Sequence, residues 1–155
     1  MIALIVVGVI VLILIIYVIA TYNGLVNFKN KVQDSWAQID VLLKRRNDLI
    51  PNLIETVKGY ATHEKTTLDA VIQARNSAVN AKDPHEKMES ANMLTEALGN
   101  LFALSENYPD LKANTNFLDL QNNLKETEDK ISYARQFYND AVMAYKNKLE
   151  MFPSN

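Results

Sequence analysis

The first twenty residues, Met1–Ala20, form an unbroken apolar run without a charged side chain. At 1.5 Å per helical residue, such a run spans about 30 Å, the thickness of a bilayer's hydrocarbon core. Tyr17 and Tyr22 stand at its far end, where amphipathic rings settle at the headgroup level. The pattern predicts a transmembrane anchor over residues 1–22, with the lipid bilayer contacted through Met1–Ala20.

A cleavable signal peptide is the alternative, because Val18-Ile19-Ala20 places small residues before Thr21. A signal peptide has a basic first region and an apolar core of roughly 7–15 residues. Here no basic residue precedes the run, and the run is longer. The sequence therefore favours a retained span.

Beyond the span, apolar residues recur every three or four positions, the period of an amphipathic helix. The first stripe predicts one long helix reaching Tyr60, and three further stripes predict three more helices over residues 23–152. The stripes are Leu25, Phe28, Val32, Trp36, Ile39, Leu43, Ile50, Leu53, Val57 and Tyr60; Leu68, Val71, Ile72 and Val79; Met88, Ala91, Leu94, Leu98, Leu101 and Leu104; and Phe117, Leu120, Leu124, Ile131, Tyr138, Val142, Tyr145 and Leu149.

Helix boundaries are marked by proline. Asp83-Pro84-His85-Glu86 is typical of a helix start, with Asp as N-cap and Pro in the first turn. Tyr108-Pro109 ends the third helix and Phe152-Pro153 the last, which leaves a short tail over 153–155. Amphipathic helices joined by short connections bury their stripes against one another. We therefore predict an all-α fold, a membrane helix followed by an antiparallel up-and-down bundle of about four helices, with the first and last longest.

The two long helices are expected to extend beyond the shorter middle pair as a two-stranded coiled-coil stalk at the membrane end. Such a stalk offers a surface for self-association. Alternatively, every apolar stripe is buried within one monomer.

Charge and composition narrow the function. The chain has 16 Lys and Arg against 18 Asp and Glu, so no basic surface for nucleic acid is expected. It has no cysteine, which excludes disulfides and thiolate chemistry. Lys29 and Lys31 follow the span and no cation precedes it. The positive-inside rule therefore predicts a single-pass cell-membrane protein with its N-terminus outside and its helical domain in the cytoplasm.

Polar residues recur at helical spacing in the second half of the first helix and fall on one strip. The strip is either a docking face for a partner protein or an ordinary solvated face. Arg45 and Arg46 could pair with carboxylates of a partner. The candidate partner-binding residues are Arg45, Arg46, Asp48, Pro51, Asn52 and Glu55, and Asp34 and Gln38 extend the strip toward the membrane.

Pro51 leaves two interpretations open. Inside a helix it lacks a donor and crowds the carbonyl of Asn47, which kinks or breaks the axis. A kink beside clustered polar groups could form a recognition feature. Equally, Pro51 could lie in the first turn of a new helix capped by Asn47 or Asp48.

The sequence contains few residues in patterns typical of catalysis or metal binding. There are two histidines, no Glu-x-x-His pair and no phosphate-binding glycine loop. A metal at His63-Glu64 would need ligands from elsewhere, so a solvated turn is favoured. The aromatic residues suit core filling, or, less readily, the lining of a ligand pocket. No cofactor is expected.

Several sequence blocks closely resemble the LemA family, over almost the whole chain. The resemblance implies a bacterial protein with one N-terminal membrane helix, its N-terminus outside, and a cytoplasmic antiparallel helical domain. It implies no enzymatic activity or cofactor and carries no catalytic residues. One departure is Asn47, where members often have His. The blocks are Tyr22-Asn23, Trp36, Gln38-Ile39-Asp40-Val41, Leu43-Lys44-Arg45-Arg46, Asp48-Leu49-Ile50-Pro51-Asn52-Leu53, Glu55-Thr56-Val57-Lys58-Gly59-Tyr60-Ala61, His63-Glu64, Ala74-Arg75, Tyr108-Pro109-Asp110-Leu111-Lys112-Ala113-Asn114, Phe117, Leu120-Gln121, Thr127-Glu128, Ala134-Arg135, Tyr138-Asn139 and Phe152-Pro153.

Together these observations predict a membrane-anchored adaptor or self-assembling scaffold without catalytic activity. Its partner would be another membrane or cytoplasmic protein, or a second copy of the chain. The alternative is a sensory helical bundle that binds a small ligand. An enzyme is the least supported class.

Overall fold

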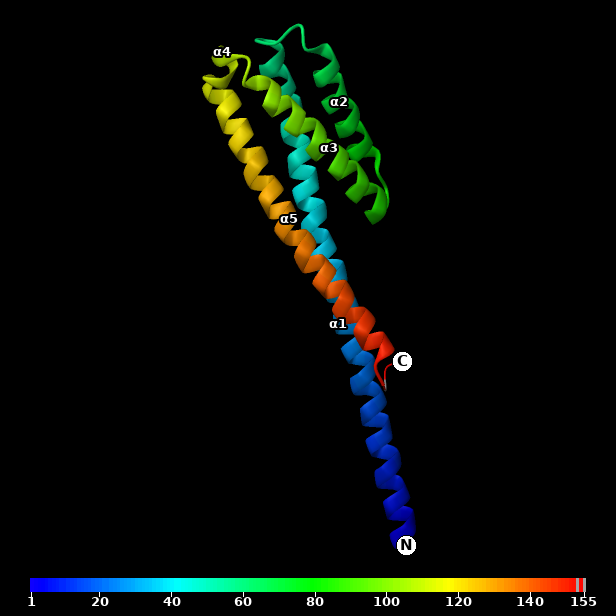
Figure 1. The fold of residues 1–155 in the computed structure, drawn as a ribbon. Coiled ribbons are helices and arrows are strands. Elements are labelled where there is room, and N and C mark those ends of the chain that lie inside the picture. Colours follow the sequence, from blue (N-terminus) through cyan, green and yellow to red (C-terminus); the bar gives the residue numbers. More distant parts are fainter. Residues whose placement is uncertain (153, 155) are drawn as a thin grey trace. The chain divides into compact units, whose positions relative to one another are not determined.

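The computed structural model describes residues 1–152 and Ser154, and these residues form helices without a strand. The all-α prediction is confirmed. The tail predicted over 153–155 lies outside the described residues except at Ser154. The helices of the described part are α1 (Ile2–Lys58), α2 (Lys65–Asn80), α3 (Pro84–Ser105), α4 (Pro109–Lys112) and α5 (Thr115–Glu150) (Figure 1).

The chain divides into two compact units, which the two longest helices share. Unit 1 comprises Met1–Ile39 and Ala134–Asn155, and unit 2 comprises Asp40–Tyr133. Unit 1 therefore contains only the first part of α1 and the last part of α5. It thus joins two helical segments that are far apart in the sequence.

The N-terminal part of α1 is apolar on every side. Its most apolar 18-residue window has a mean hydropathy of 3.6 and no buried residue. Among the described helices, α1 is the one long and apolar enough to cross a membrane. A helix that exposes apolar side chains all round needs lipid or protein to cover it. The start of α1 is thus a candidate membrane anchor.

Pro51 lies inside α1, which continues without interruption from Ile2 to Lys58. The interpretation of Pro51 as the first turn of a new helix is therefore wrong. Helix α1 reaches the end that the apolar stripe predicted, within two residues of Tyr60.

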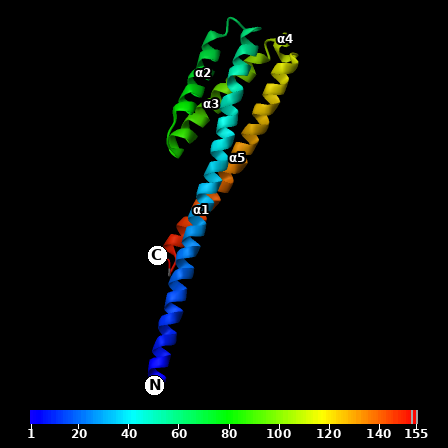
Figure 2. The same cartoon turned by 180° about the vertical axis from the view of Figure 1, so that it is seen from behind.

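In unit 2, the chain runs up along α1, down α2, up α3 and down the first part of α5 (Figures 1 and 2). The predicted up-and-down order is confirmed here. Asp83 caps α3, since its side chain accepts a hydrogen bond from the Glu86 N–H at 2.9 Å. The core comprises Ile50, Leu53, Ile54, Val57, Ala61, Leu68, Val71, Ala74, Leu94, Ala97, Leu98, Leu101, Leu111, Phe117, Leu120 and Leu124.

The short helix α4 turns the corner between α3 and α5, and its four residues were not predicted. Leu111 from this turn is buried in the core. Asn114 then caps α5 by accepting from the Phe117 N–H at 2.9 Å, and its amide donates to the Tyr60 hydroxyl at 2.9 Å. The corner is therefore fastened to the end of α1.

In unit 1, α1 and α5 pack through aromatic and small residues. The rings of Trp36 and Tyr138 meet edge to face with centroids 5.5 Å apart. Lys31 lies over the Phe137 ring at 6.0 Å. The buried residues of this segment are Ser35, Ile39, Ala134 and Ala141.

Candidate functional site

Five of the six predicted partner-binding residues lie exposed on one face of α1. We call this set the α1 polar strip: Arg45, Asp48, Pro51, Asn52 and Glu55. On one side of the strip α1 is joined to α2, and on the other to α5. The second joint is a hydrogen bond from the Asn116 amide to the Thr56 hydroxyl, 3.0 Å long. The strip is thus the outward face of α1 in unit 2.

Two charges of the strip are paired with neighbours on the same helix. Lys44 lies 3.1 Å from Asp48, and Lys58 lies 3.3 Å from Glu55. Such exposed pairs contribute little to stability, because water screens them and long side chains lose freedom. Arg45 has no carboxylate within ion-pair distance among the described residues. It is a cation that a partner's carboxylate could meet.

Arg45 also acts at a distance on Glu126 of α5. The Lys130 ammonium donates to Glu126 and holds the pKa of that carboxyl below its ordinary value of 4.5, and Arg45 adds a smaller effect in the same direction. The positive field of Arg45 therefore reaches across the α1–α5 joint. Arg45 is the cationic end of the strip.

Arg46, the sixth predicted residue, is buried rather than exposed, which corrects the prediction that it would meet a partner. Only 1% of its surface is accessible. Its guanidinium donates to Glu128 on α5 at 2.6 Å, and to the Thr95 hydroxyl at 2.8 Å and the Ala91 carbonyl at 2.9 Å, both on α3. Arg46 therefore joins three helices inside unit 2. It stabilises the bundle and is not available for docking.

The burial of Arg46 has a signal in the sequence. Positions 39, 43, 46, 50, 53 and 57 follow the alternating spacing of four and three that marks one buried stripe. Residue 46 falls on that stripe, between Leu43 and Ile50, while residue 45 falls outside it. The two arginines have the same chemistry, but their positions along the helix differ by one residue. This difference in register decides that Arg46 is buried and Arg45 is exposed.

Pro51 explains a contact between α1 and α2. Proline has no N–H, so the Asn47 carbonyl one turn earlier lacks its helical donor. The Arg75 Nε of α2 donates to that carbonyl at 3.0 Å. An unsatisfied buried carbonyl would be costly, and Arg75 removes that cost. The sequence indicated the missing donor, but it did not identify Arg75 as the replacement.

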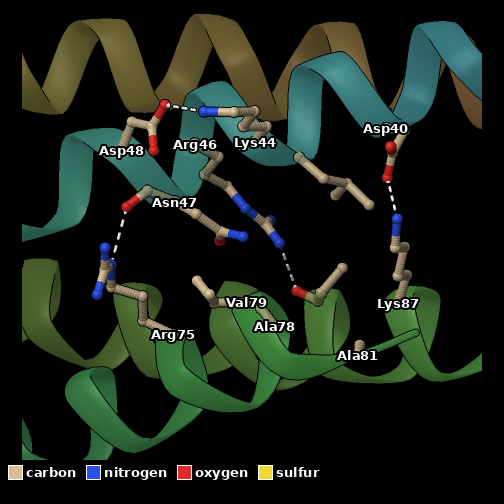
Figure 3. Close-up of a pocket in the computed structure, with 12 residues that line it drawn as sticks. Asp40, Lys44, Arg46, Asn47, Asp48, Arg75, Ala78, Val79, Ala81 and Lys87 are labelled. Atoms are coloured by element: carbon tan, nitrogen blue, oxygen red, sulfur yellow. Dashed lines mark hydrogen bonds and ion pairs between the residues drawn. The ribbon is translucent and has the colours of Figure 1, made fainter.

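A cleft of about 330 Å³ opens beside these contacts, between α1, α2 and α3 (Figure 3). The Lys87 ammonium pairs with Asp40 at one end of it. In the close-up the Asn47 amide points into the space between the helices, and its Oδ1 is buried without a hydrogen-bond partner in the described part. The lining residues are Asp40, Leu43, Lys44, Arg46, Asn47, Asp48, Arg75, Ala78, Val79, Ala81, Lys87 and Ala91.

The cleft suits binding better than catalysis. Its two aspartates are each held by a lysine, and its lining has no histidine, serine or cysteine that could act as a nucleophile or base. Sequence reasoning identified Asp48 but not Asp40, Arg75 or Lys87 as part of a site. These residues come from different helices, so their spacing along the chain carries no motif.

His63 and Glu64 lie in the turn before α2. The Tyr108 hydroxyl donates to Glu64 at 2.8 Å, and this bond raises the pKa of Tyr108 above its ordinary value of 10.0. No group of three or more His, Cys, Asp or Glu side chains that could hold a metal ion occurs within the described residues. Glu64 therefore has a structural contact, between the start of α2 and the corner at α4.

Comparison with known proteins gives a family and several relatives. The model of the LemA family matches residues 35–155. Protein LemA of Metamycoplasma hominis is 27% identical over 134 residues, covering 86% of this chain and 61% of that protein. Magnetosome protein MamQ 2 of Paramagnetospirillum magneticum is 23% identical over 160 residues, covering 86% and 59%. Magnetosome protein MamQ of Magnetospirillum gryphiswaldense is 20% identical over 158 residues, covering 85% and 58%. The chain spans about 60% of the length of these relatives.

Proposed function

The chain belongs to the LemA family, and on that basis we propose that it is a membrane-anchored helical adaptor or self-assembling scaffold without catalytic activity. The family is not a known enzyme family, and no catalytic constellation accompanies the cleft. The relatives named as magnetosome proteins support a membrane-associated role. The partner is a second protein, or a second copy of this chain.

One observation carries the proposal: the same uninterrupted helix, α1, contains the exposed apolar segment and the α1 polar strip. A protein held on the strip is thereby connected to the membrane through a single helix. Arg45 makes no ion pair within the described part of the chain, and the strip adds polar groups at Asn52 and Glu55. These groups fit an acidic or polar helix of a partner. The buried Arg46 network keeps α1 in register, so that this face stays outward.

The proposed location is the cell membrane, crossed once, with the N-terminus outside and the helical domain in the cytoplasm. The lysines that follow the span, Lys29 and Lys31, are exposed and support this orientation. The test is protease digestion of intact cells that express the chain with a C-terminal epitope. Protection of the epitope, lost on permeabilisation, is expected. Digestion in intact cells would reverse the orientation.

The adaptor role is tested by photo-crosslinking in native membranes. A photoreactive residue at Asn52, inside the strip, is expected to give one discrete adduct. The same residue at Asn122, exposed on α5, is the matched control and is expected to give none. Arg45→Glu is expected to remove most of the Asn52 adduct, because it reverses the unpaired charge. Equal, diffuse labelling at both positions would contradict a docking role for the strip.

Ligand sensing is a second candidate, supported by the cleft and by the buried Asn47 oxygen that lacks a partner. A ligand that binds the folded state raises the unfolding temperature by mass action. Fractionated small-molecule extracts are expected to raise it in the native chain but not in Ala78→Trp, in which the new ring fills the cleft. A shift of equal size in both chains would exclude the cleft as its source.

A further inference from the structure

The C-terminal end of α5 presents large apolar side chains outward. Phe152 is 85% exposed and Met151 is 61% exposed, and Leu149 is partly exposed beside them. Large apolar residues are usually covered in a folded protein, and clustered exposure marks a contact surface. This cluster lies in unit 1, apart from the strip and the cleft.

Hydrogen bonds close the end of α5 into a defined turn. The Met151 N–H donates to the Asn147 carbonyl, and the Ser154 N–H donates to the Met151 carbonyl, both at 3.0 Å. The Ser154 hydroxyl lies within bonding distance of the Lys148 carbonyl as well. These bonds take up carbonyls that a helix end leaves without donors. The turn therefore holds Met151 and Phe152 in place as a projecting pair.

This turn lies against the end of the apolar segment of α1. Ser154 lines a groove of about 220 Å³ together with five α1 residues, Tyr17, Val18, Thr21, Tyr22 and Leu25. Both views show the last turn of α5 beside α1 (Figures 1 and 2). The groove thus places the end of α5 at the same level of α1 as the two tyrosines.

We propose that Met151 and Phe152 insert into the interfacial layer of the bilayer that α1 crosses, so that the chain meets the membrane at both ends. The proposal rests on the membrane anchor proposed above. If Met1–Ala20 fills the hydrocarbon core, Tyr17 and Tyr22 lie at the headgroup level, and the turn at Ser154 lies there with them. At that level a phenyl ring and a thioether are covered by lipid instead of water.

Charge around the turn favours the same occupant. Among the described residues next to the turn, Lys146 is exposed, Lys148 is half-buried and Glu150 is an exposed carboxylate. Lys29 and Lys31 add two exposed ammonium groups from α1 of the same unit. Lysines near a bilayer surface are attracted to anionic headgroups. Apolar residues that project among lysines are typical of an element that lies in a membrane interface.

The absence of cysteine allows a direct test with single spin labels in the full chain, reconstituted in vesicles of phosphatidylethanolamine and phosphatidylglycerol. Labels are placed at Met151→Cys, at Ile10→Cys in the middle of the apolar run as the lipid reference, and at Asn122→Cys as the aqueous reference. Oxygen concentrates in lipid and a nickel chelate in water, so their relative effect on the label reports its depth. The oxygen-to-nickel ratio at 151 is expected to be several-fold above that at 122 and below that at 10.

A second substitution shows whether the phenyl ring holds the turn in lipid. In the 151-labelled chain, Phe152→Asp is expected to lower the ratio to the aqueous value, while Phe152→Leu keeps it. A ratio at 151 equal to that at 122, with 10 in lipid, overturns the proposal and leaves the anchor intact. A label at 151 shielded from both reagents means that a second copy or another protein covers the turn, which also overturns it. An aqueous ratio at 10 refutes the anchor itself, and this proposal with it.

Discussion

Unit 2 and unit 1 are built from the same two long helices but are held together by different interactions. In unit 2, polar side chains cross between helices at several levels: Arg46 to Glu128, Arg75 to the Asn47 carbonyl, and Tyr108 to Glu64. In unit 1, aromatic rings contribute to the contact between α1 and α5, at Trp36–Tyr138 and Lys31–Phe137. Hydrogen bonds require fixed geometry, whereas aromatic contacts tolerate small shifts. The cross-helix hydrogen bonds therefore fix the arrangement of the helices in unit 2, while ring packing contributes to unit 1.

The largest effect is expected from Glu128→Leu, which tests the polar side of this contrast. It leaves the buried Arg46 guanidinium without its carboxylate. Because Glu128 is 36% exposed, we expect a cost of about 3 kcal/mol, the low end of the range for a fully buried pair. Equilibrium unfolding of the full chain in detergent, followed by circular dichroism, measures the loss. The double variant Arg46→Met/Glu128→Leu is expected to lose less than the single variant, because no buried charge remains. An equal or greater loss in the double variant would contradict this account.

A smaller effect, confined to unit 1, is expected from Trp36→Ala. The ring is half-buried, so its removal should cost roughly 2 kcal/mol, less than for a fully buried Trp. Amide hydrogen exchange at residues 134–150 should accelerate by about thirtyfold, while unit 2 keeps its protection. The control is Tyr133→Ala, since that ring is 70% exposed. Loss of protection throughout unit 2 would mean that the two units unfold together.

Arg75→Ala is expected to cost about 1.5 kcal/mol, because the buried Asn47 carbonyl loses a charged donor. The loss should shrink in a Pro51→Ala background, where residue 51 supplies the missing helical N–H. The measured quantity is the coupling free energy between the two substitutions, from four unfolding curves. Strict additivity would show that Arg75 does not replace the donor that Pro51 lacks.

The smallest effect is a pH dependence at the corner near α4. The bond from Tyr108 to Glu64 raises the Tyr108 pKa above 10.0 in the folded chain, so the folded state keeps a proton that the unfolded state releases. Its stabilising contribution is therefore complete below pH 10 and is lost as the pH rises through the higher, folded-state pKa. Unfolding titrations should show an alkaline decline in the native chain that is weaker in Tyr108→Phe. An identical decline in both would assign it to other groups.

Much of the fold follows from the sequence, because helical periodicity is a local property. The stripes gave the end of α1 within two residues, and Asp83-Pro84 gave the start of α3. Helix α4 was missed because four residues are too few to show a period. The exposure of Arg45, Asp48 and Glu55 was predictable for the same reason.

The contacts behind the site were less predictable. Arg46 was placed on the surface because arginine usually lies there, yet its register on the apolar stripe indicated the interior. Its partner Glu128 is 82 residues away, and no local pattern links two positions so far apart. The role of Arg75 was predictable only in part. Pro51 indicated that the Asn47 carbonyl lacks a helical donor, but only the packing of α2 against α1 identifies Arg75 as the replacement.

The 82 residues between Arg46 and Glu128 also set the order of biogenesis. The first helix of the bundle, which carries Arg46, leaves the ribosome early. Glu128, whose carboxylate pairs with the Arg46 guanidinium, is made late. At about 5–20 residues per second, the nascent chain waits roughly 4–16 s before that charge is matched. During this interval the apolar segment Met1–Ala20 is already available for membrane insertion. If this segment is the anchor proposed above, its insertion precedes completion of the bundle, which then forms beside the bilayer.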